Sequence, residues 1–367
     1  MLKEEKFLIL ASQLEYPKDL TFINDLTKKN FNWSIFFDLA KKNSLVNFLY
    51  KNLEKYEKLN FIPKFVKKNL EGLYYYNLAR NIFILKEIKR LFKFFNLRNI
   101  KVIGLKGLFL SIYLYDDIDL RPTTDIDLLI KKEDLKKINK ILCSLGYIQP
   151  PYFDNFFLKE ETTPINSLVY KNYTLGIFVH LHTHIINTTL PIEFFVKKIP
   201  MENIWQKVVS LSFEDIEILM LSWQHLLLQL VHHSFCHNFD KLLFLYDIKQ
   251  LLTKDKDLIK KETIKEEFKK FYSWELANFV FLKLEKLFKI KITFREDCPE
   301  IFNFFSRFKI PSAFYYFVIL PDLKDKINFI KKYFLPSKYV IAQNLYISSD
   351  RIRFYHYLLR IKNNLFT

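Results

Sequence analysis

The chain has 367 residues, half of them hydrophobic, which is enough for two or three domains with buried cores. Only five residues are Gly, against 39 Phe and 21 Tyr, and this excludes collagen-like chains and most tightly turned all-β folds. The formal net charge of +17 permits a polyanionic partner such as a nucleotide, RNA or a membrane surface.

The excess of positive charge has two interpretations. Most of the basic residues are Lys, whereas proteins that grip phosphate in two places usually rely on the fork of Arg. Enrichment in Lys, Phe, Tyr, Asn and Ile is also what AT-rich coding produces. The charge can therefore reflect either composition or function.

Cysteine usage and the length of the apolar runs bear on the cellular compartment. Cys143, Cys236 and Cys298 are scattered and odd in number, and no two of them form a CxxC pair, so we expect no disulfide framework. No uninterrupted apolar run approaches the roughly 18 to 20 residues that a membrane span requires. We expect a protein without a membrane span, located in the reducing cytoplasm.

Periodicity divides the chain into three regions. In residues 1–95, apolar residues recur at helical spacing, which predicts a helical N-terminal region. In residues 96–190, where most of the glycines lie, short β-prone runs alternate with helical ones. The elements expected there are, in chain order, strand 101–105, helix 107–115, strand 125–130, helix 133–145, and a hairpin of strands 166–171 and 177–184.

Residues 191–367 have mainly helical texture, interrupted by prolines. Ser212, with Asp215 three residues later, resembles a capping box and predicts a helix that continues through Val231. The chain as a whole is predicted to be an α+β protein, in which a small mixed sheet is flanked by helical N- and C-terminal regions.

The strongest chemical signal is a pair of aspartates in the predicted strand 125–130. Asp125 and Asp127 are two residues apart, so their carboxylates project from the same face of the strand. Carboxylates at this spacing can share a divalent cation, and oxygen ligands suit Mg²⁺, or Mn²⁺ in its place. An isolated Asp-x-Asp is more often a solvated pair, so its context decides its meaning.

That context is a glycine turn 18 residues earlier. Gly107, in the sequence GLKG, lies between a predicted strand and a predicted helix. A glycine turn at a helix N-terminus exposes N–H groups that can bind a phosphate, and Lys106 adds a positive charge there.

The stretch VIGLKGLFLSIYLYDDIDLRPTTDIDLLI resembles the core of an uncharacterised bacterial nucleotidyltransferase family of the DNA polymerase β-like superfamily. Lys106, Gly107, Arg121, Asp125 and Asp127 match the motif of this family position by position. The resemblance implies a nucleotidyltransferase core over residues 96–190.

The resemblance also implies roles for the matching residues. Asp125 and Asp127 would hold the metal, and the loop from Gly104 to Gly107 with Lys106 would bind the β and γ phosphates of a nucleoside triphosphate such as ATP. Arg121 would neutralise phosphate charge or pair with the carboxylates to fix the loop.

Two later segments resemble further family motifs. The run IFVHLHTHI is similar to a strand of the form vDlHw, which places His182 at the family's histidine. The segment HLLLQLVHHSFCHNFDKLLFLYDIKQLL resembles a His-rich helix followed by an aspartate, here Asp247. His182, His232 and Asp247 are therefore candidates for the substrate side of the site.

One position departs from the superfamily pattern. The third carboxylate is expected where this chain has His180. Three interpretations follow: His180 serves as a general base or a nitrogen ligand to a metal, Glu160 or Glu161 replaces the carboxylate, or the protein has lost catalysis and only binds nucleotide.

The remaining histidines have structural and metal-binding interpretations. His180, His182 and His184 alternate along one predicted strand, but neighbouring positions on one strand splay apart, so polar residues flanking a substrate groove are the preferred interpretation over a three-histidine metal site. His225, His232 and Cys236 fall along one side of a very apolar helix, where hydrogen-bonded core histidines are expected. Asp247 either pairs with one of these histidines or contacts substrate.

The predicted reaction is transfer of a nucleoside monophosphate from a nucleoside triphosphate to a hydroxyl-type acceptor, with release of pyrophosphate. The acceptor can be a small molecule, a protein or RNA, and the sequence does not distinguish them. Two alternatives stay open: a catalytically degenerate protein that binds nucleotide or RNA, and a basic scaffold that binds nucleic acid through the Lys-rich segment 324–338.

Overall fold

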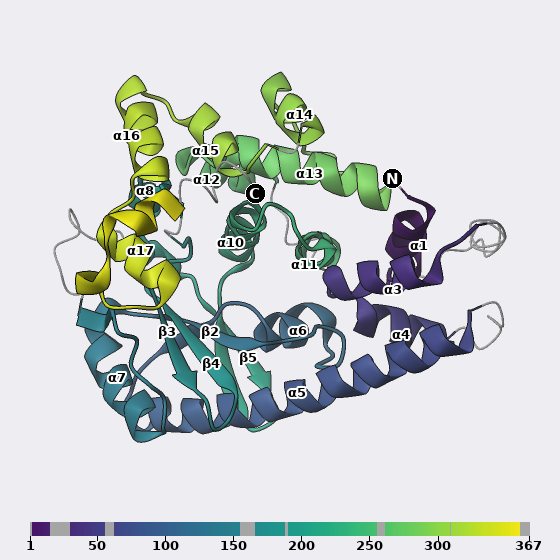
Figure 1. Ribbon diagram of the computed structural model, residues 1–367, viewed down its shortest axis with the longest axis horizontal. Helices are drawn as coiled ribbons and strands as arrows, with labels where there is room; N and C mark the ends of the chain where they lie inside the picture. The colour runs from purple at the N-terminus through teal and green to yellow at the C-terminus, as the bar shows by residue number, and fades with distance from the viewer. Residues whose placement is uncertain are drawn as a thin grey trace.

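The computed structural model describes residues 2–14, 30–55, 62–154, 166–187, 190–254, 261–308 and 310–359. It confirms an α+β protein in which helices from both ends of the chain surround one mixed sheet (Figure 1). None of the helices in these ranges combines the length and the apolar character needed to cross a membrane. Glu160 and Glu161, the possible substitutes for the third carboxylate, lie outside the described residues.

The sheet has six strands in the order β3-β4-β2-β1-β6-β5. β2 pairs antiparallel with β1 and parallel with β4, while β1 pairs parallel with β6. The strands are β1 Val102–Gly104, β2 Asp125–Ile130, β3 Ser167–Asn172, β4 Ile177–His182, β5 Val209–Phe213 and β6 Ile216–Met220. The strands expected from the sequence within 96–190 are therefore present, with ends shifted by a few residues.

The helix expected from Ser212 is wrong, because residues 209–220 form the antiparallel hairpin of β5 and β6. Polar and apolar residues alternate in the run VSLSF, which is the two-residue period of a strand. Glu214 adopts a positive φ of 49° in the turn. Ser and Asp favour turns as well as helix caps, so the capping-box pattern here belongs to a hairpin, and the helix starts only at Trp223.

The described helices of the N-terminal region are α1 Lys3–Ala11, α3 Trp33–Lys42, α4 Val46–Lys55 and α5 Lys64–Asn96. They pack on one another, and only α5 extends beneath the sheet in the view of Figure 1. The long helix α5 runs along the bottom of the view in Figure 1 and contacts both β2 and α6, Leu108–Tyr115. Its buried face includes Ile84, Ile88, Leu91 and Phe95, so a helical stripe of apolar residues holds it against the core.

Most helices of the C-terminal region lie above the sheet in the view of Figure 1. The helices of this region are α8 Glu193–Lys198, α9 Met201–Gln206, α10 Trp223–Cys236, α11 Leu242–Lys254, α12 Lys261–Lys270, α13 Trp274–Phe288, α14 Glu300–Arg307, α15 Ala313–Ile319, α16 Leu323–Phe334 and α17 Lys338–Leu345. α10 is buried around most of its circumference and packs against α11 and α13. Gln343 of α17 donates a hydrogen bond to the carbonyl of Ser167, so α17 lies against the edge strand β3.

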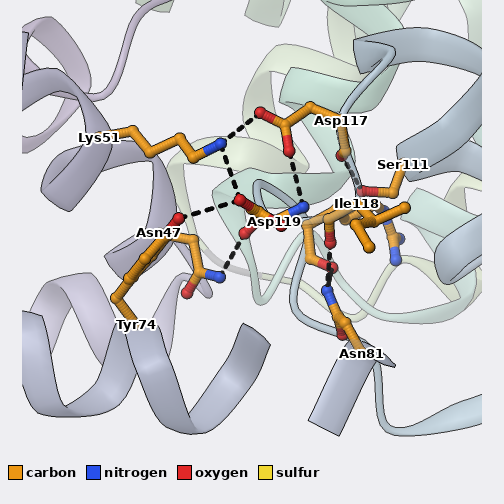
Figure 2. Close-up of polar contacts among 9 residues, drawn as sticks. Asn47, Lys51, Tyr74, Asn81, Ser111, Asp117, Ile118 and Asp119 are labelled. Atoms are coloured by element: carbon orange, nitrogen blue, oxygen red, sulfur yellow. Dashed lines mark hydrogen bonds and ion pairs between the residues drawn. The ribbon is translucent and has the colours of Figure 1, made fainter. Parts of the chain in front are cut away.

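The N-terminal helices also fix the loop that joins α6 to β2, as Figure 2 shows. The Lys51 ammonium on α4 lies 2.5 Å from a carboxylate oxygen of Asp117 and 3.1 Å from one of Asp119. The hydroxyl of Tyr74 on α5 donates to Asp119 over 3.1 Å. Each of these groups is partly buried, so the loop is anchored away from bulk solvent.

Asn81 makes the most buried contacts to this loop. Its side-chain amide donates to the carbonyls of Ile118 and Arg121 over 2.6 and 3.0 Å, and its side-chain oxygen accepts from the N–H of Thr123 over 3.1 Å. The residue is fully buried. One side chain on α5 thus satisfies three backbone groups just ahead of β2.

We expect Asn81→Ala to lower the free energy of unfolding by about 3 kcal/mol, because it leaves several buried backbone groups without partners. Urea unfolding followed by circular dichroism would measure the loss. Asn77→Ala is the matched control on the same helix, since Asn77 is only half-buried and its amide donates to Asn47. Its expected cost is about 1 kcal/mol or less, and equal losses in the two variants would contradict the assignment.

Candidate active site

The two aspartates of β2 open onto a cavity of about 390 Å³. Asp127 is buried, whereas Asp125 at the start of the strand is half-buried. Of the residues predicted from the sequence, the cavity is lined by Lys106, Gly107, Arg121, Asp125, Asp127, His180, His182 and His232. Gly104 and Asp247 lie outside its lining. Segments far apart in the sequence, from β2, β4 and α10, meet here.

Gly107 begins the helix α6 at the edge of this cavity. Its φ of 59° favours glycine, and a Cβ atom there would lie 2.9 Å from the Cγ2 atom of Thr123. Glycine is required at position 104 for a different reason, because a Cβ atom there would lie 2.3 Å from the ring of Phe109. Gly107 therefore shapes the turn that faces the cavity, and Gly104 admits an aromatic ring of the core behind it.

Asp127 is surrounded by groups that stabilise its negative charge. Its Oδ1 atom lies 3.0 Å from Nζ of Lys106, 2.9 Å from Nε2 of His182 and 3.6 Å from Nδ1 of His180. Burial by itself would raise the pKa of Asp127, but the Lys106 ammonium and the His182 hydrogen bond hold that pKa well below its usual range. Asp127 is thus an ionised carboxylate that faces the cavity.

Asp125 has the opposite electrostatic environment. Burial, followed by the negative charge of Asp127, raises the pKa of Asp125 to about 6, although Lys106 and the Thr124 hydroxyl work against this. Two carboxylates on one face of a strand cannot both ionise without a cost. A cation bound between them would remove that cost.

His180 occupies the sheet position where the third carboxylate was expected, because the parallel register of β2 and β4 pairs it with Asp127. Burial lowers the pKa of His180 to about 3, so its imidazole is neutral at physiological pH. A group with so low a pKa is a weak general base. The nitrogen-ligand interpretation of His180 is therefore favoured over the general-base interpretation.

Within the described part of the chain, one group of three potential ligands lies close enough together to hold a metal ion. It consists of Asp127, His180 and His182, whose ligand atoms are all within 4.8 Å of one another. His184 does not join this group, because its Nδ1 atom accepts from the N–H of Ile186 and its Nε2 atom faces the carbonyl of Ile199. His180 and His182 converge on Asp127, although neighbouring positions on one strand were expected to splay apart.

His225 and His232 lie on α10, where the sequence predicts hydrogen-bonded core histidines in preference to metal ligands. The structure agrees with this prediction. The ring of His232 lies 2.9 Å from both the Tyr316 hydroxyl and the Ser273 hydroxyl. His225 lies 2.9 Å from the Ser222 hydroxyl and 3.0 Å from Glu267. Both rings have their nitrogen atoms engaged by neighbouring side chains.

Other residues of α10 and its C-terminal turn line the cavity and were missed as site residues by the sequence reasoning. They are Gln229, His233 and His237. Burial lowers the pKa values of His233 and His237, so this wall presents neutral imidazoles. The Oε1 atom of Gln229 is buried and has no hydrogen-bond partner among the described residues. The sequence signal that could have identified Gln229 is the presence of a polar glutamine in a very apolar helical segment.

Arg121 pairs with Asp247, which lies on α11. The guanidinium approaches both carboxylate oxygens within 3.1 to 3.2 Å, and the Tyr115 hydroxyl donates to the same carboxylate over 2.9 Å. Both charged residues are buried. Of the two interpretations of Asp247, pairing with a histidine of α10 is wrong, because its carboxylate binds Arg121 and Tyr115 instead.

The site combines a glycine turn at a helix N-terminus with an Asp-x-Asp strand, and both line one cavity. This combination is typical of a nucleotidyltransferase-like α+β core. Residues 29–288, more than half of the chain, match the family described as uncharacterised nucleotidyltransferase, and the chain belongs to this family. This match confirms the resemblance of its motifs and includes the helices from α3 to α13. No curated protein and no solved structure matches the chain.

The raised pKa of Asp125 leads to a prediction about stability. The folded-state pKa of about 6 exceeds the ordinary value of 3.8, so the native protein holds this proton more tightly than the unfolded chain. Stability should therefore fall as the pH rises through the interval between these values. We expect metal-free Asp125→Asn to exceed the wild type by about 2 kcal/mol near pH 7.5, and the gap to close near pH 4.

Urea unfolding in EDTA at both pH values would test this expectation. Asp127→Asn is the matched control, because the low pKa of Asp127 means that its charge stabilises the native state at neutral pH. That variant should be less stable than the wild type near pH 7.5. A loss of stability in Asp125→Asn at the same pH would contradict the assignment.

Proposed function

We propose that the protein transfers a nucleoside monophosphate from a nucleoside triphosphate to a hydroxyl-type acceptor and releases pyrophosphate, with the help of a divalent metal ion. The observation that carries the proposal is the placement of Asp125 and Asp127 in one cavity with Lys106 and the N-terminal turn of α6. Membership of a nucleotidyltransferase family supports the same class of reaction. Cys143, Cys236 and Cys298 are free thiols, which supports a cytoplasmic location.

The residues of the cavity have distinct roles in this proposal. The backbone N–H groups that follow Gly107 bind the β and γ phosphates, since a helix N-terminus attracts anions. Lys106 pairs with Asp127 within the same lining, which places its ammonium next to the proposed phosphate site. Arg121 acts through its pair with Asp247, which holds the loop ahead of β2.

The carboxylates of Asp125 and Asp127 fit a divalent cation, Mg²⁺ or Mn²⁺, because a positive ion would remove the repulsion that raises the pKa of Asp125. When bound, the ion supplies charge stabilisation for the attacking and leaving oxygens. His180 and His182 approach the same side of Asp127. They support the metal rather than remove the acceptor's proton.

The wall formed by α10 is the place proposed for the acceptor. It faces β2 across the cavity and carries His232, His233 and the unpartnered Oε1 atom of Gln229. A buried acceptor atom without a partner is costly unless a ligand donates to it. A hydroxyl of the acceptor, whether on a small molecule, a protein or RNA, can make that hydrogen bond.

A catalytically degenerate protein that binds nucleotide or RNA is the second candidate function. Two observations favour it: His180 replaces the third carboxylate, and Lys106 already neutralises Asp127 at 3.0 Å. Fewer negative charges weaken the attraction for Mg²⁺. In this case nucleotide would bind equally well with and without metal, and no pyrophosphate would form.

Calorimetric titration with non-hydrolysable analogues of ATP, GTP, CTP and UTP, in Mg²⁺, Mn²⁺ or EDTA, separates these functions. We expect metal-dependent binding that weakens at least about tenfold in Asp127→Asn and in Asp125→Asn. Asp322→Asn is the control, since Asp322 is exposed and outside the cavity lining. Its binding should equal that of the wild type.

The other outcomes discriminate among the alternatives. Binding in EDTA that survives both substitutions in the cavity, without pyrophosphate release on any acceptor pool, would favour the degenerate protein. Nucleic-acid binding that falls steeply with salt and ignores these substitutions would favour a basic scaffold, for which the Lys residues of α16 are the available charges. Failure to bind any nucleotide would contradict the proposed transfer.

A further inference from the structure

The ligand group beside the Asp-x-Asp motif contains two nitrogen donors and one carboxylate. Nε2 of His182 and Nδ1 of His180 lie 2.9 and 3.6 Å from the same oxygen of Asp127. Ligands that are about 2.0 to 2.2 Å from one ion are separated from each other by roughly 3 to 3.5 Å. The separations from Asp127 to the two imidazole nitrogens are close to this spacing, and all three donors lie within 4.8 Å of one another.

Two paired strands of the sheet hold these donors. Asp127 and His180 face each other in the parallel register of β2 and β4, and His182 ends β4 on the same side. The two imidazole rings lie 4.5 Å apart, so they converge on Asp127 despite their spacing along one strand. All three residues line the cavity, from which an ion can reach them.

We infer that Asp127, His180 and His182 bind a first-row transition metal ion, with Zn²⁺ and Mn²⁺ as probes, in preference to Mg²⁺. Mg²⁺ takes oxygen ligands almost exclusively, whereas imidazole nitrogen suits first-row transition metals, whose affinity rises from Mn²⁺ to Cu²⁺ and is also high for Zn²⁺. This inference rests on the proposed function, because it specifies the metal of the same cavity. In this inference, His180 supplies a nitrogen ligand at the position where a carboxylate oxygen was expected, so the site mixes nitrogen and oxygen ligands.

Lys106 provides a second way to test the same metal site, because its ammonium also binds Asp127. Its ammonium lies 3.0 Å from the Asp127 oxygen that both imidazoles approach. A metal ion on that oxygen must compete with this ammonium, so the lysine limits the affinity of the empty site. Metal binding would free Lys106 for the phosphates, which couples the metal to the nucleotide.

The experiment is metal binding to chelator-stripped, nucleotide-free protein, measured by calorimetry with Zn²⁺, Mn²⁺ and Mg²⁺ and by electron paramagnetic resonance of Mn²⁺. We expect Mn²⁺ to bind at least tenfold more tightly than Mg²⁺, and Zn²⁺ more tightly still. His180→Asp, which replaces nitrogen by a carboxylate, should reduce the Mn²⁺ to Mg²⁺ ratio at least tenfold. His180→Gln should weaken Mn²⁺ and Zn²⁺ binding by a similar factor.

His237→Gln is the matched control, since His237 lines the cavity but does not belong to the ligand group. Its metal preference should equal that of the wild type. Lys106→Met should tighten Mn²⁺ binding severalfold by removing the competing ammonium. Circular dichroism of each variant would establish that a lost site does not reflect unfolding, and the wild-type preference alone already tests the inference if a variant does not fold.

The outcomes separate this inference from the proposed function. Mg²⁺ binding as tight as that of Mn²⁺ in the wild type, or a preference unchanged by His180→Asp, would overturn the inference and leave nucleotidyl transfer standing. Unchanged Mn²⁺ binding in Asp127→Asn would remove Asp127 from the ligand set. Transition-metal selectivity in a protein that binds no nucleotide would support the metal site and contradict the transfer reaction.

Discussion

The negative charge of Asp127 is buried in the interior of the sheet, where only 3% of the residue is exposed. A charge in such a place is expensive unless other groups compensate it. Lys106 from the turn ahead of α6 and His182 from the end of β4 provide that compensation. The adjacent strands β1, β2 and β4 are therefore linked through one carboxylate, which lines the cavity.

The loop that leads into β2 is held from both flanks of the protein. On one side, Asn81 and Lys51 of the N-terminal helices bind its backbone and its carboxylates. On the other side, Asp247 of α11 forms a buried ion pair with Arg121. Leaving either charge of a buried pair alone costs about 3 to 5 kcal/mol. The core is thus supported by both helical regions, in agreement with a family match that extends over residues 29–288.

The histidines fall into groups that the fold separates. His180 and His182 lie against Asp127. His225 and His232 are hydrogen-bonded by side chains of the helical core, and His232 also lines the cavity together with His233 and His237. Burial lowers the pKa of His180 and His232 to about 3, so these rings act as neutral donors and acceptors. Positive charge at the cavity consequently comes from lysines such as Lys106 and Lys241, which suits a phosphate ligand.

The sequence by itself determined the family, the α+β class, and the order of strand, glycine turn, helix and Asp-x-Asp strand, because these depend on local periodicity and short motifs. It also indicated that the apolar setting of His225 and His232 makes them core residues. It misread residues 209–220, since Ser and Asp suit a cap and a turn equally well. Only the tertiary structure decided that Arg121 pairs with Asp247 and that His180 and His182 converge on Asp127. Strand order and register bring together residues that are distant along the chain, and local sequence patterns do not specify which distant residues will meet.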